Sequence, residues 1–542
     1  MKTSFLIPFL FLAATLSATA QVLSNKTVFT EADTLRGSLR PERAYDVQKY
    51  HLQVRVDPEE RFISGVNTIS FKTEEQLPVM QVDLFENMQV DSILHNSQPL
   101  EYSRKHNAVF ISFEEPLKEN ELDSISFYFS GHPKVARNAP WDGGFVFDKD
   151  QEGNHWIAVA VQGTGASLWY PNKDHQSDEP EEVLIEAAVP NGLMNVSNGR
   201  FVGKEDLGDG YTRWSWKVNS PINNYNIVLN IANYVHFSDT YKDLDLDYYV
   251  LPYNLQKAQK QFEEVKPMMD CFYEKFGPYP FEEDGFKLVE TPYLGMEHQS
   301  AVAYGNKYMM GYLGNDLSGT GIGLKWDYII IHESGHEWYG NSITATDIAD
   351  MWIHEGFTAY SEAVYVECRW GKEKALEYLK GNRRGIGNRS SIIGSYGVNS
   401  EGSGDMYFKG ANLLNTIRSI YNDDELWWKT LKDYTLTYRH QIIDTQTTED
   451  FFDAATPVDL QPVFDQYLRH AALPELQLKK EGDTFFYRWK ADVENFAMPV
   501  DVLIKGEEVR LHPTADWQKL KQEIESREEI KVNELEFYIA TS

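Results

Sequence analysis

Two histidines in the middle of the chain are spaced so that they could bind one metal ion. Residues 329–339 contain His332 and His336, and the imidazoles of such an i, i+4 pair lie on the same face of an α-helix. On that helix, Glu333 is rotated by about 100° from His332. Glu333 can therefore lie beside a metal without binding it, where a general base for a metal-bound water is needed.

A downstream carboxylate completes a set of metal ligands. Glu355 follows His336 after eighteen intervening residues. Two histidines and one carboxylate, with a position left for water, are typical of catalytic zinc sites, whereas structural zinc sites are usually four-coordinate and rich in Cys. The chain has two Cys, Cys271 and Cys368, and neither is close to the motif in sequence. A chance match is the alternative, but the added carboxylate favours a catalytic site for one Zn²⁺ per chain.

These motifs resemble those of the aminopeptidase N family of zinc metallopeptidases, which also contains the leukotriene-epoxide hydrolases. The family has His-Glu-x-x-His, eighteen residues, and then Glu within Trp-Leu-x-Glu-Gly-Phe-Ala. Here the similarity extends through residues 338–341 and 352–357, and it covers most of the chain from Tyr45 onward. The resemblance implies that both histidines and Glu355 bind zinc and that Glu333 is the general base.

A second motif lies about thirty-five residues before the histidines. Residues 294–298 (LGMEH) are similar to the family's Gly-x-Met-Glu-Asn motif, although Leu294 replaces the first Gly and His298 replaces Asn. From the residues alone, this segment would be an edge strand. The resemblance implies that Gly295 and Met296 line the substrate site and that Glu297 binds the substrate's free α-amine.

A glutamine in the N-terminal half is a further candidate for amine binding. Gln162 ends an apolar run and begins a Gly-rich turn, which from the residues alone would be a β-turn with a solvated amide. The family has a Gln or Glu before a Pro and an acidic-Pro ending, and it helps to hold the amine. Gln162 precedes Pro171 and the acidic-Pro sequence at 178–180 in a similar way, with different residues between them.

Tyr407 precedes an amphipathic helical pattern that contains Leu413, Leu414 and Ile417. A tyrosine at a helix start is usually a packing residue. In the family, however, Tyr-x-Lys-Gly supplies a phenol that donates a hydrogen bond to the carbonyl oxygen as it becomes an oxyanion. Residues 407–410 (YFKG) match this motif, and the resemblance implies that Tyr407 is catalytic together with Glu333.

The composition restricts the possible partners. The chain has 542 residues, 42% of them hydrophobic and 13% aromatic, as expected for a globular protein with several domains. Its formal net charge of −31 argues against nucleic acid as a partner, because phosphate binding requires a basic surface. The sequence does not indicate an oligomeric state.

The pattern of apolar residues predicts a multidomain α+β fold. Alternating short segments predict an N-terminal all-β domain over 21–245, in which residues 22–43 form an extended lead-in. Helical spacing predicts a mainly helical domain over 246–472. The family resemblance implies that the β domain is saddle-like and that the helical domain is a thermolysin-like zinc domain. Strand-like runs return over 473–542 and predict a small β-sandwich, so that the family's large C-terminal helical domain is absent from this sequence.

Residues 1–20 have the pattern of a secretory signal peptide. A short basic start precedes an apolar stretch, and the small residues 18–20 precede Gln21. An uncleaved anchor is the alternative, but the apolar stretch is short for a membrane span and no later stretch is long enough. We therefore expect an exported protein, periplasmic or secreted. In such a compartment Cys271 and Cys368 could pair, which their spacing does not decide.

Together these features predict a zinc-dependent aminopeptidase that hydrolyses the N-terminal bond of peptides with a free amine. A thermolysin-like endopeptidase would share the zinc ligands but needs no Glu297. A non-catalytic peptide-binding relative would need neither Glu333 nor Tyr407. An epoxide hydrolase would use the same metal on a lipid, and nothing in the sequence specifically supports it.

Overall fold

The computed structural model describes residues 28–542, so the predicted signal peptide at 1–20 lies outside the described residues. The lead-in predicted as extended contains a short helix, α1 (Glu31–Gly37), and that prediction is wrong there. Thr30 and Asp33 each accept a hydrogen bond from the other's backbone N–H, which forms a capping box at the start of α1. A local cap, rather than apolar periodicity, begins this helix.

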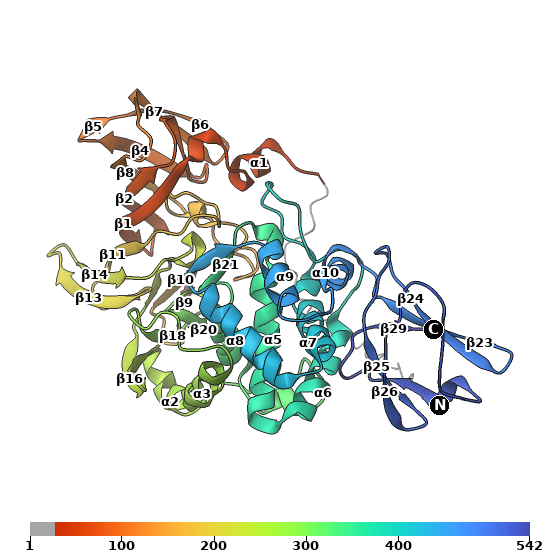
Figure 1. Cartoon of the computed structure of the whole chain (residues 1–542). Coiled ribbons are helices and arrows are strands. Elements are labelled where there is room, and N and C mark those ends of the chain that lie inside the picture. Colours follow the sequence, from red (N-terminus) through yellow and green to blue (C-terminus); the bar gives the residue numbers. More distant parts are fainter. Residues whose placement is uncertain (1–27) are drawn as a thin grey trace, which may run out of the picture.

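The N-terminal part of the chain is built on one eight-stranded sheet (Figure 1). Strand β1 pairs in parallel with β11, and the other neighbours are antiparallel. Inward-facing residues of β1 alternate with half-buried ones, as expected for a sheet covered mainly on one face. In spatial order the strands are β13 (Arg200–Asp206), β14 (Tyr211–Val218), β11 (Glu182–Pro190), β1 (Tyr45–Asp57), β2 (Phe62–Thr73), β8 (Leu122–Gly131), β4 (Met88–His95) and β5 (Gln98–Pro99).

Two smaller sheets complete this region. One contains β3 (Leu77–Asp83), β7 (Ala108–Leu117) and β6 (Glu101–Lys105). The other contains β12 (Met194–Val196), β15 (Asn230–Ala232), β10 (His155–Ala160) and β9 (Gly144–Lys149). Because β10 ends two residues before Gln162, this second sheet positions the turn that carries the glutamine.

A five-stranded sheet joins the β region to the helices. Its order is β16 (Val235–Tyr241), β17 (Leu244–Val250), β18 (Phe286–Glu290), β20 (Val302–Tyr304) and β19 (Gly295–Met296). Strands β17, β18 and β20 are parallel, and the short edge strand β19 is antiparallel to β20. The sheet includes strands on both sides of residue 245, and its residues contribute to both hydrophobic cores. The domain boundary at 245 stays a prediction.

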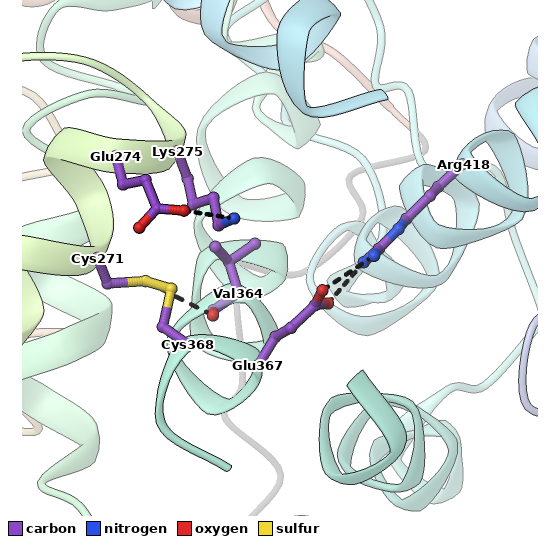
Figure 2. Close-up of a disulfide and its surroundings, with 7 residues drawn as sticks. All are labelled: Cys271, Glu274, Lys275, Val364, Glu367, Cys368 and Arg418. Carbon is purple, nitrogen blue, oxygen red and sulfur yellow. Dashed lines mark hydrogen bonds and ion pairs between the residues drawn. A yellow bond between two sulfur atoms is a disulfide. The ribbon is translucent and has the colours of Figure 1, made fainter. Parts of the chain in front are cut away.

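The helices gather in the middle of the molecule, around α5 (Figure 1). They are α2 (Leu255–Gln261), α3 (Val265–Lys275), α4 (Tyr328–Gly335), α5 (Trp352–Trp370), α6 (Lys372–Asn382), α7 (Phe408–Tyr421), α8 (Asp424–Thr437), α9 (Thr445–Asp453) and α10 (Gln461–Phe464). A disulfide between Cys271 of α3 and Cys368 of α5, whose Cα atoms are 5.9 Å apart, ties two of them together (Figure 2).

The end of the chain forms two further small sheets, shown beside α7 and α10 in Figure 1. One contains β27 (Gln518–Lys519), β24 (Thr484–Lys490), β23 (Glu475–Glu481) and β29 (Ala540–Thr541), and the other contains β26 (Glu507–Leu511), β25 (Val500–Ile504) and β28 (Ile530–Val532). Their apolar residues share one core with the central helices. The predicted multidomain α+β architecture is confirmed. Among the described residues, no helix combines the length and apolar character needed to cross a membrane.

Candidate active site

The three predicted metal ligands meet on two adjacent helices. Helix α4 is capped by Asp327, whose side chain accepts hydrogen bonds from two backbone N–H groups of the first turn, and every residue of α4 is buried. Its last turn carries His332, its C-cap residue is His336, and the first turn of α5 carries Glu355. Glu355 Oε2 lies 3.3 Å from His336 Nε2 and 3.7 Å from His332 Nε2.

This arrangement fits a bound Zn²⁺. One potential ligand atom from each of the three side chains lies within 4.8 Å of the others. Glu355 Oε2 is buried and makes no hydrogen bond to any residue of 28–542, and leaving a buried carboxylate oxygen unsatisfied costs free energy. Two imidazole nitrogens and a carboxylate oxygen are the donors that zinc accepts in catalytic sites. The three side chains would hold the ion, which would satisfy that oxygen.

A second layer of contacts orients the imidazoles. His332 Nδ1 lies 2.6 Å from Glu362 Oε1, and Tyr378 donates a hydrogen bond of 2.6 Å to the other oxygen of Glu362. His336 Nδ1 lies 2.9 Å from the carbonyl oxygen of Tyr339. These acceptors favour a proton on Nδ1 and therefore direct each Nε2 lone pair towards the metal position.

The sequence analysis missed Glu362, although a signal was present. Glu362 follows Glu355 by seven residues, which is two turns of α5, so that both carboxylates lie on the same face of the helix. Both side chains are buried, and a carboxylate on the buried face of a helix is rarely left without a partner.

Glu333 lies beside the predicted metal ligand His336. Its side chain belongs to a second group of close ligand-type atoms, with Glu297 and His336. Burial raises the pKa of the Glu333 carboxyl to about 7, with His332 and His336 opposing the shift and Glu297 adding to it. A pKa in this range suits a group that both accepts and returns a proton at neutral pH.

Gly295 allows the edge strand β19 to approach Glu333 closely. A Cβ atom at this position would lie 2.9 Å from Glu333 Oε1 and 2.7 Å from a side-chain atom of Ile329. The residue next to it, Met296, is buried. The predicted motif therefore places a backbone strand directly against Glu333, and Glu297 follows that strand.

Glu297 accepts hydrogen bonds from two residues of the N-terminal β region. Gln162 Nε2 donates to its Oε1, and Tyr225 donates to the same oxygen at 2.9 Å. Burial raises the pKa of the Glu297 carboxyl, and the neighbouring imidazole of His336 opposes this shift. The sequence analysis placed Gln162 here, but it missed Tyr225. Tyr225 belongs to a short 3₁₀ segment 72 residues away from Glu297, and no local pattern marks it.

Tyr407 lies beside the predicted metal ligands, immediately before α7. Its ring stacks against His332 with 6.2 Å between the ring centroids. Burial and the nearby Glu355 carboxylate raise the pKa of the phenol well above its ordinary value, so that it remains a hydrogen-bond donor at neutral pH. The structure thus brings together all nine residues for which a catalytic, metal-binding or substrate-binding role was predicted.

Comparison with known proteins agrees with this geometry. A peptidase family M1 domain matches residues 260–467. Tricorn protease-interacting factor F2 of Thermoplasma acidophilum is 20% identical over 492 residues, covering 83% of this chain and 57% of the relative. Probable aminopeptidase 1 of Sulfurisphaera tokodaii is 20% identical, covering 82% and 56%. The chain therefore spans little more than half the length of these relatives.

Solved structures show the same fold. The M1 zinc metallopeptidase of Deinococcus radiodurans matches with a TM-score of 0.65 at 18% identity, covering 80% of this chain and 95% of the other. A mutant of that protein bound to a Tyr-Ser-Ala substrate matches equally well and is covered to 96%. The fold is therefore that of M1 zinc metallopeptidases. The peptidase family M1 domain that matches residues 260–467 agrees with this fold, and together they confirm the predicted resemblance.

Proposed function

We propose that this protein is a zinc aminopeptidase that removes the first residue from peptides with a free N-terminus. One observation carries the proposal: the buried carboxylate of Glu297 lies beside the base Glu333 and the ligand His336. Within residues 28–542, no lysine or arginine forms an ion pair with Glu297. A buried anion requires a positive partner, and the ammonium group of a substrate supplies one.

His332, His336 and Glu355 would hold one Zn²⁺ ion. When bound, zinc polarises a carbonyl oxygen and lowers the pKa of a water ligand to about 7. Glu333 accepts the proton of the attacking water and delivers it to the leaving amine. The protonated phenol of Tyr407 donates a hydrogen bond to the substrate carbonyl oxygen as negative charge develops there.

The amine-binding residues determine which bond is cut. Glu297 binds the α-ammonium group, and Gln162 and Tyr225 orient the Glu297 carboxylate through their hydrogen bonds. Because Glu333 and Glu297 are neighbours, only the first peptide bond of a substrate held in this way reaches the base. The names of the matched relatives, which include aminopeptidases, support this assignment.

Fluorogenic aminoacyl substrates test the proposal directly. We expect cleavage of substrates with a free amine, loss of activity with a chelator, and recovery when zinc is restored. N-acetylated forms of the same substrates should be cut at least tenfold more slowly. Equal cleavage of free and acetylated substrates would indicate an endopeptidase, and unchanged activity in metal-free protein would overturn the zinc assignment.

The proposal extends to the location of the protein, which we infer to be periplasmic or secreted. The signal-like pattern at residues 1–20 supports export, as does the disulfide between Cys271 and Cys368, since disulfides persist mainly in oxidising compartments. N-terminal sequencing of the native protein should find a chain that begins at Gln21. A mature protein that retains Met1 and stays in the cytoplasm would contradict this inference.

A further inference from the structure

The turn that follows Gln162 is held by an arginine from helix α1, more than a hundred residues earlier in the chain. Arg36 Nη1 donates hydrogen bonds to the carbonyl oxygens of Gly163, at 3.0 Å, and of Thr164. The turn itself is tight, because Thr164 N–H donates to the carbonyl oxygen of Gln162 at 2.7 Å. A single guanidinium group therefore binds the two residues next to the glutamine that contacts Glu297.

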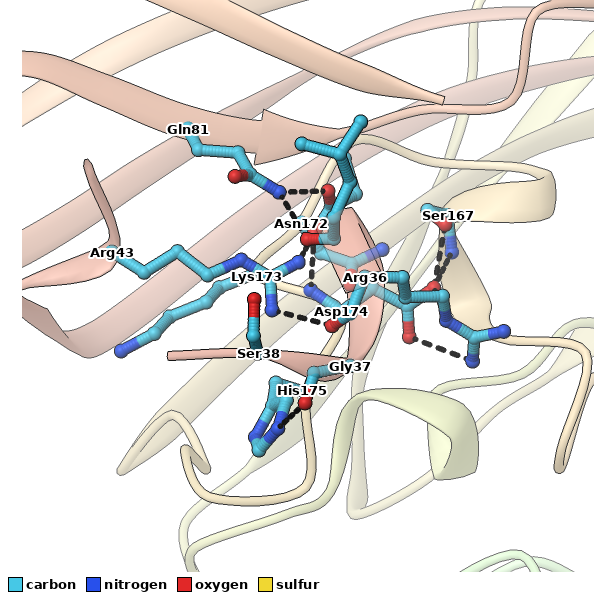
Figure 3. Close-up of polar contacts among 12 residues, drawn as sticks. Arg36, Gly37, Ser38, Arg43, Gln81, Ser167, Asn172, Lys173, Asp174 and His175 are labelled. Atoms are coloured by element: carbon cyan, nitrogen blue, oxygen red, sulfur yellow. Dashed lines mark hydrogen bonds and ion pairs between the residues drawn. The ribbon is translucent and has the colours of Figure 1, made fainter. Parts of the chain in front are cut away.

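Arg36 is itself held in place by the β region (Figure 3). Its Nε lies 3.2 Å from Asp174 Oδ2, and the Asp174 side chain is only 7% exposed. The same Asp174 oxygen accepts hydrogen bonds from the backbone and hydroxyl of Ser167. The carbonyl oxygen of Arg36 accepts a hydrogen bond of 2.7 Å from Arg43. Such charge-assisted contacts restrict the position of the guanidinium group more than an exposed ion pair would.

The backbone of the turn leaves space for this contact at one position. Gly165 has a φ angle of +102°, and a Cβ atom there would lie 2.2 Å from both Arg36 Nη2 and Asp174 Oδ2. Only glycine adopts this conformation readily and allows so close an approach. The glycine at position 165 in the Gly-rich sequence after Gln162 thus leaves room for the guanidinium group of Arg36.

Packing alone does not hold the turn. A cavity of about 420 Å³ borders it, with a lining that includes Arg36, Gly163, Thr164, Ser167 and Asn399. Asn399, which belongs to the segment before Tyr407, reaches the carbonyl oxygen of Gly163 at only 3.4 Å. Beside such an opening, the charge-assisted hydrogen bonds of Arg36 restrain the turn together with the backbone hydrogen bond that Gly165 N–H donates to the carbonyl oxygen of Val161 at 2.6 Å.

We propose that Arg36 is a positioning residue for the amine site: it holds the turn after Gln162, so that the Gln162 amide is presented to Glu297. This inference rests on the proposed aminopeptidase function and adds to it a residue outside the active site. Arg36 touches neither Glu297 nor the metal ligands, so its effect passes through Gln162.

Substitution of Arg36 tests the inference. We expect Arg36→Gln to raise KM for a free aminoacyl substrate about tenfold and to change kcat less than twofold, because the base and metal ligands are untouched. The KM of Arg36→Lys should lie between that of Arg36→Gln and that of the wild type, because an ammonium group cannot donate to two carbonyl oxygens in the fork geometry of a guanidinium group. Glu31→Gln is the matched control: it removes an exposed ion pair of the same helix with Lys105 and should leave KM unchanged.

A double-mutant cycle separates positioning from general loosening. If Arg36 acts through Gln162, then Arg36→Gln combined with Gln162→Ala should raise KM no more than Gln162→Ala alone. If the double variant raises KM by the product of the two single fold-changes, the two residues act independently and the inference is overturned. An unchanged KM in Arg36→Gln would overturn it as well. If Arg36→Gln fails to fold, Asp174→Asn weakens the same restraint, and it must raise KM in the same direction for the inference to stand.

A binding measurement distinguishes this inference from the proposed function. An amino acid amide and its des-amino analogue are compared as inhibitors. Arg36→Gln should weaken inhibition by the amide about tenfold and leave inhibition by the des-amino analogue unchanged. A general structural defect would weaken inhibition by both compounds. If wild-type protein binds both equally, the aminopeptidase proposal fails. If the wild type prefers the amide and Arg36→Gln retains the full preference, only the role of Arg36 is wrong.

Discussion

The proposed metal-binding half and the proposed amine-binding half of the site are built in different ways. The metal ligands lie on two helices that are near each other in sequence, and a disulfide joins the end of one of these helices to α3. The amine-binding residues Gln162, Tyr225 and Glu297 come from three distant segments, and two of these belong to the N-terminal β region. The chemistry thus depends on local helix geometry, whereas substrate recognition depends on long-range contacts that can be disturbed without loss of the metal.

The largest effect should come from the base on the metal-binding side. We expect Glu333→Gln to lower kcat by about 10²–10⁴-fold and to leave zinc content unchanged, because the amide keeps the shape of the side chain but cannot accept a proton. Steady-state kinetics and metal analysis on the same preparation measure both quantities.

Glu337 provides a matched control for this change. Burial raises the pKa of its carboxyl to about 8, so that it is largely protonated at neutral pH and glutamine imitates it well. Glu337→Gln should therefore retain activity within a few fold. Near-normal turnover of zinc-loaded Glu333→Gln would assign the base to another residue.

On the amine-binding side, Glu297→Ala should reduce kcat/KM for aminoacyl substrates by about 10–100-fold, because a charge-assisted hydrogen bond contributes roughly 1.5–3 kcal/mol. Zinc content should stay at the wild-type level. Acetylation of the substrate should cause a similar loss in the wild type and a much smaller additional loss in the variant, since both changes delete one interaction. Full additivity would show that Glu297 does not contact the amine.

The residues that form hydrogen bonds to the metal ligands should influence zinc affinity rather than the rate of the reaction. Glu362→Gln keeps an acceptor for only one of its two partners, His332 and Tyr378, and should weaken zinc binding by about 10–100-fold. Competition with a chromophoric chelator measures the change. With saturating zinc, kcat should recover to near the wild-type value, and a persistent loss would mean that Glu362 contributes directly to the reaction.

The same contrast explains how much of the site could be predicted from the sequence. His332 and His336 were predictable because helical spacing places an i, i+4 pair on one face, with Glu333 beside them, and Glu355 was predictable from its resemblance to the family motif eighteen residues further on. Tyr225 was not, because only the folded arrangement of two regions brings it to Glu297. Arg36 was missed for a similar reason, and α1 was missed because its capping box pairs Thr30 with Asp33 rather than with the more usual Glu or Gln.

The fold shows the same limit. Alternating residues predicted the strands of the N-terminal region, but not that β1 and β11 pair in parallel, since strand order depends on long-range contacts. The pairing of Cys271 with Cys368 was equally open, because a spacing of 97 residues does not indicate whether two side chains meet.

The disulfide allows a test of how much a cross-link within the metal-binding half contributes to the stability of the protein. Replacing Cys271 and Cys368 together by serine should lower the free energy of unfolding by about 2–4 kcal/mol, because a long loop is released in the unfolded chain. Urea denaturation of the metal-free protein measures this change. Glu274→Gln, an exposed substitution on the same helix, should have no effect. Equal stabilities would show that the cross-link does not stabilise this half.

The smallest expected effect is a change in the pH dependence of stability. It concerns Glu179, which lies at the contact between the two halves. This residue follows β10 and precedes β11, and its carboxyl is buried. Burial raises its pKa to about 8, and a hydrogen bond from Thr344, close to the metal-binding helices, opposes the shift. Because the folded-state pKa lies above the unfolded value of about 4.5, the contribution to stability is complete below about pH 4.5 and is lost as the pH rises towards 8.

Glu179→Gln removes this titration. The Tm of the wild type should therefore fall more steeply between pH 5 and pH 8 than that of the variant, so that the difference in Tm between variant and wild type becomes more positive at higher pH. Differential scanning calorimetry across this range measures the two slopes. An exposed carboxylate that does not influence Glu179 supplies the control: Glu115→Gln, on β7, should leave the slope as it is in the wild type. Parallel slopes for Glu179→Gln and the wild type would mean that Glu179 is ionised in the folded protein and that this contact between the halves is formed by a charged carboxylate.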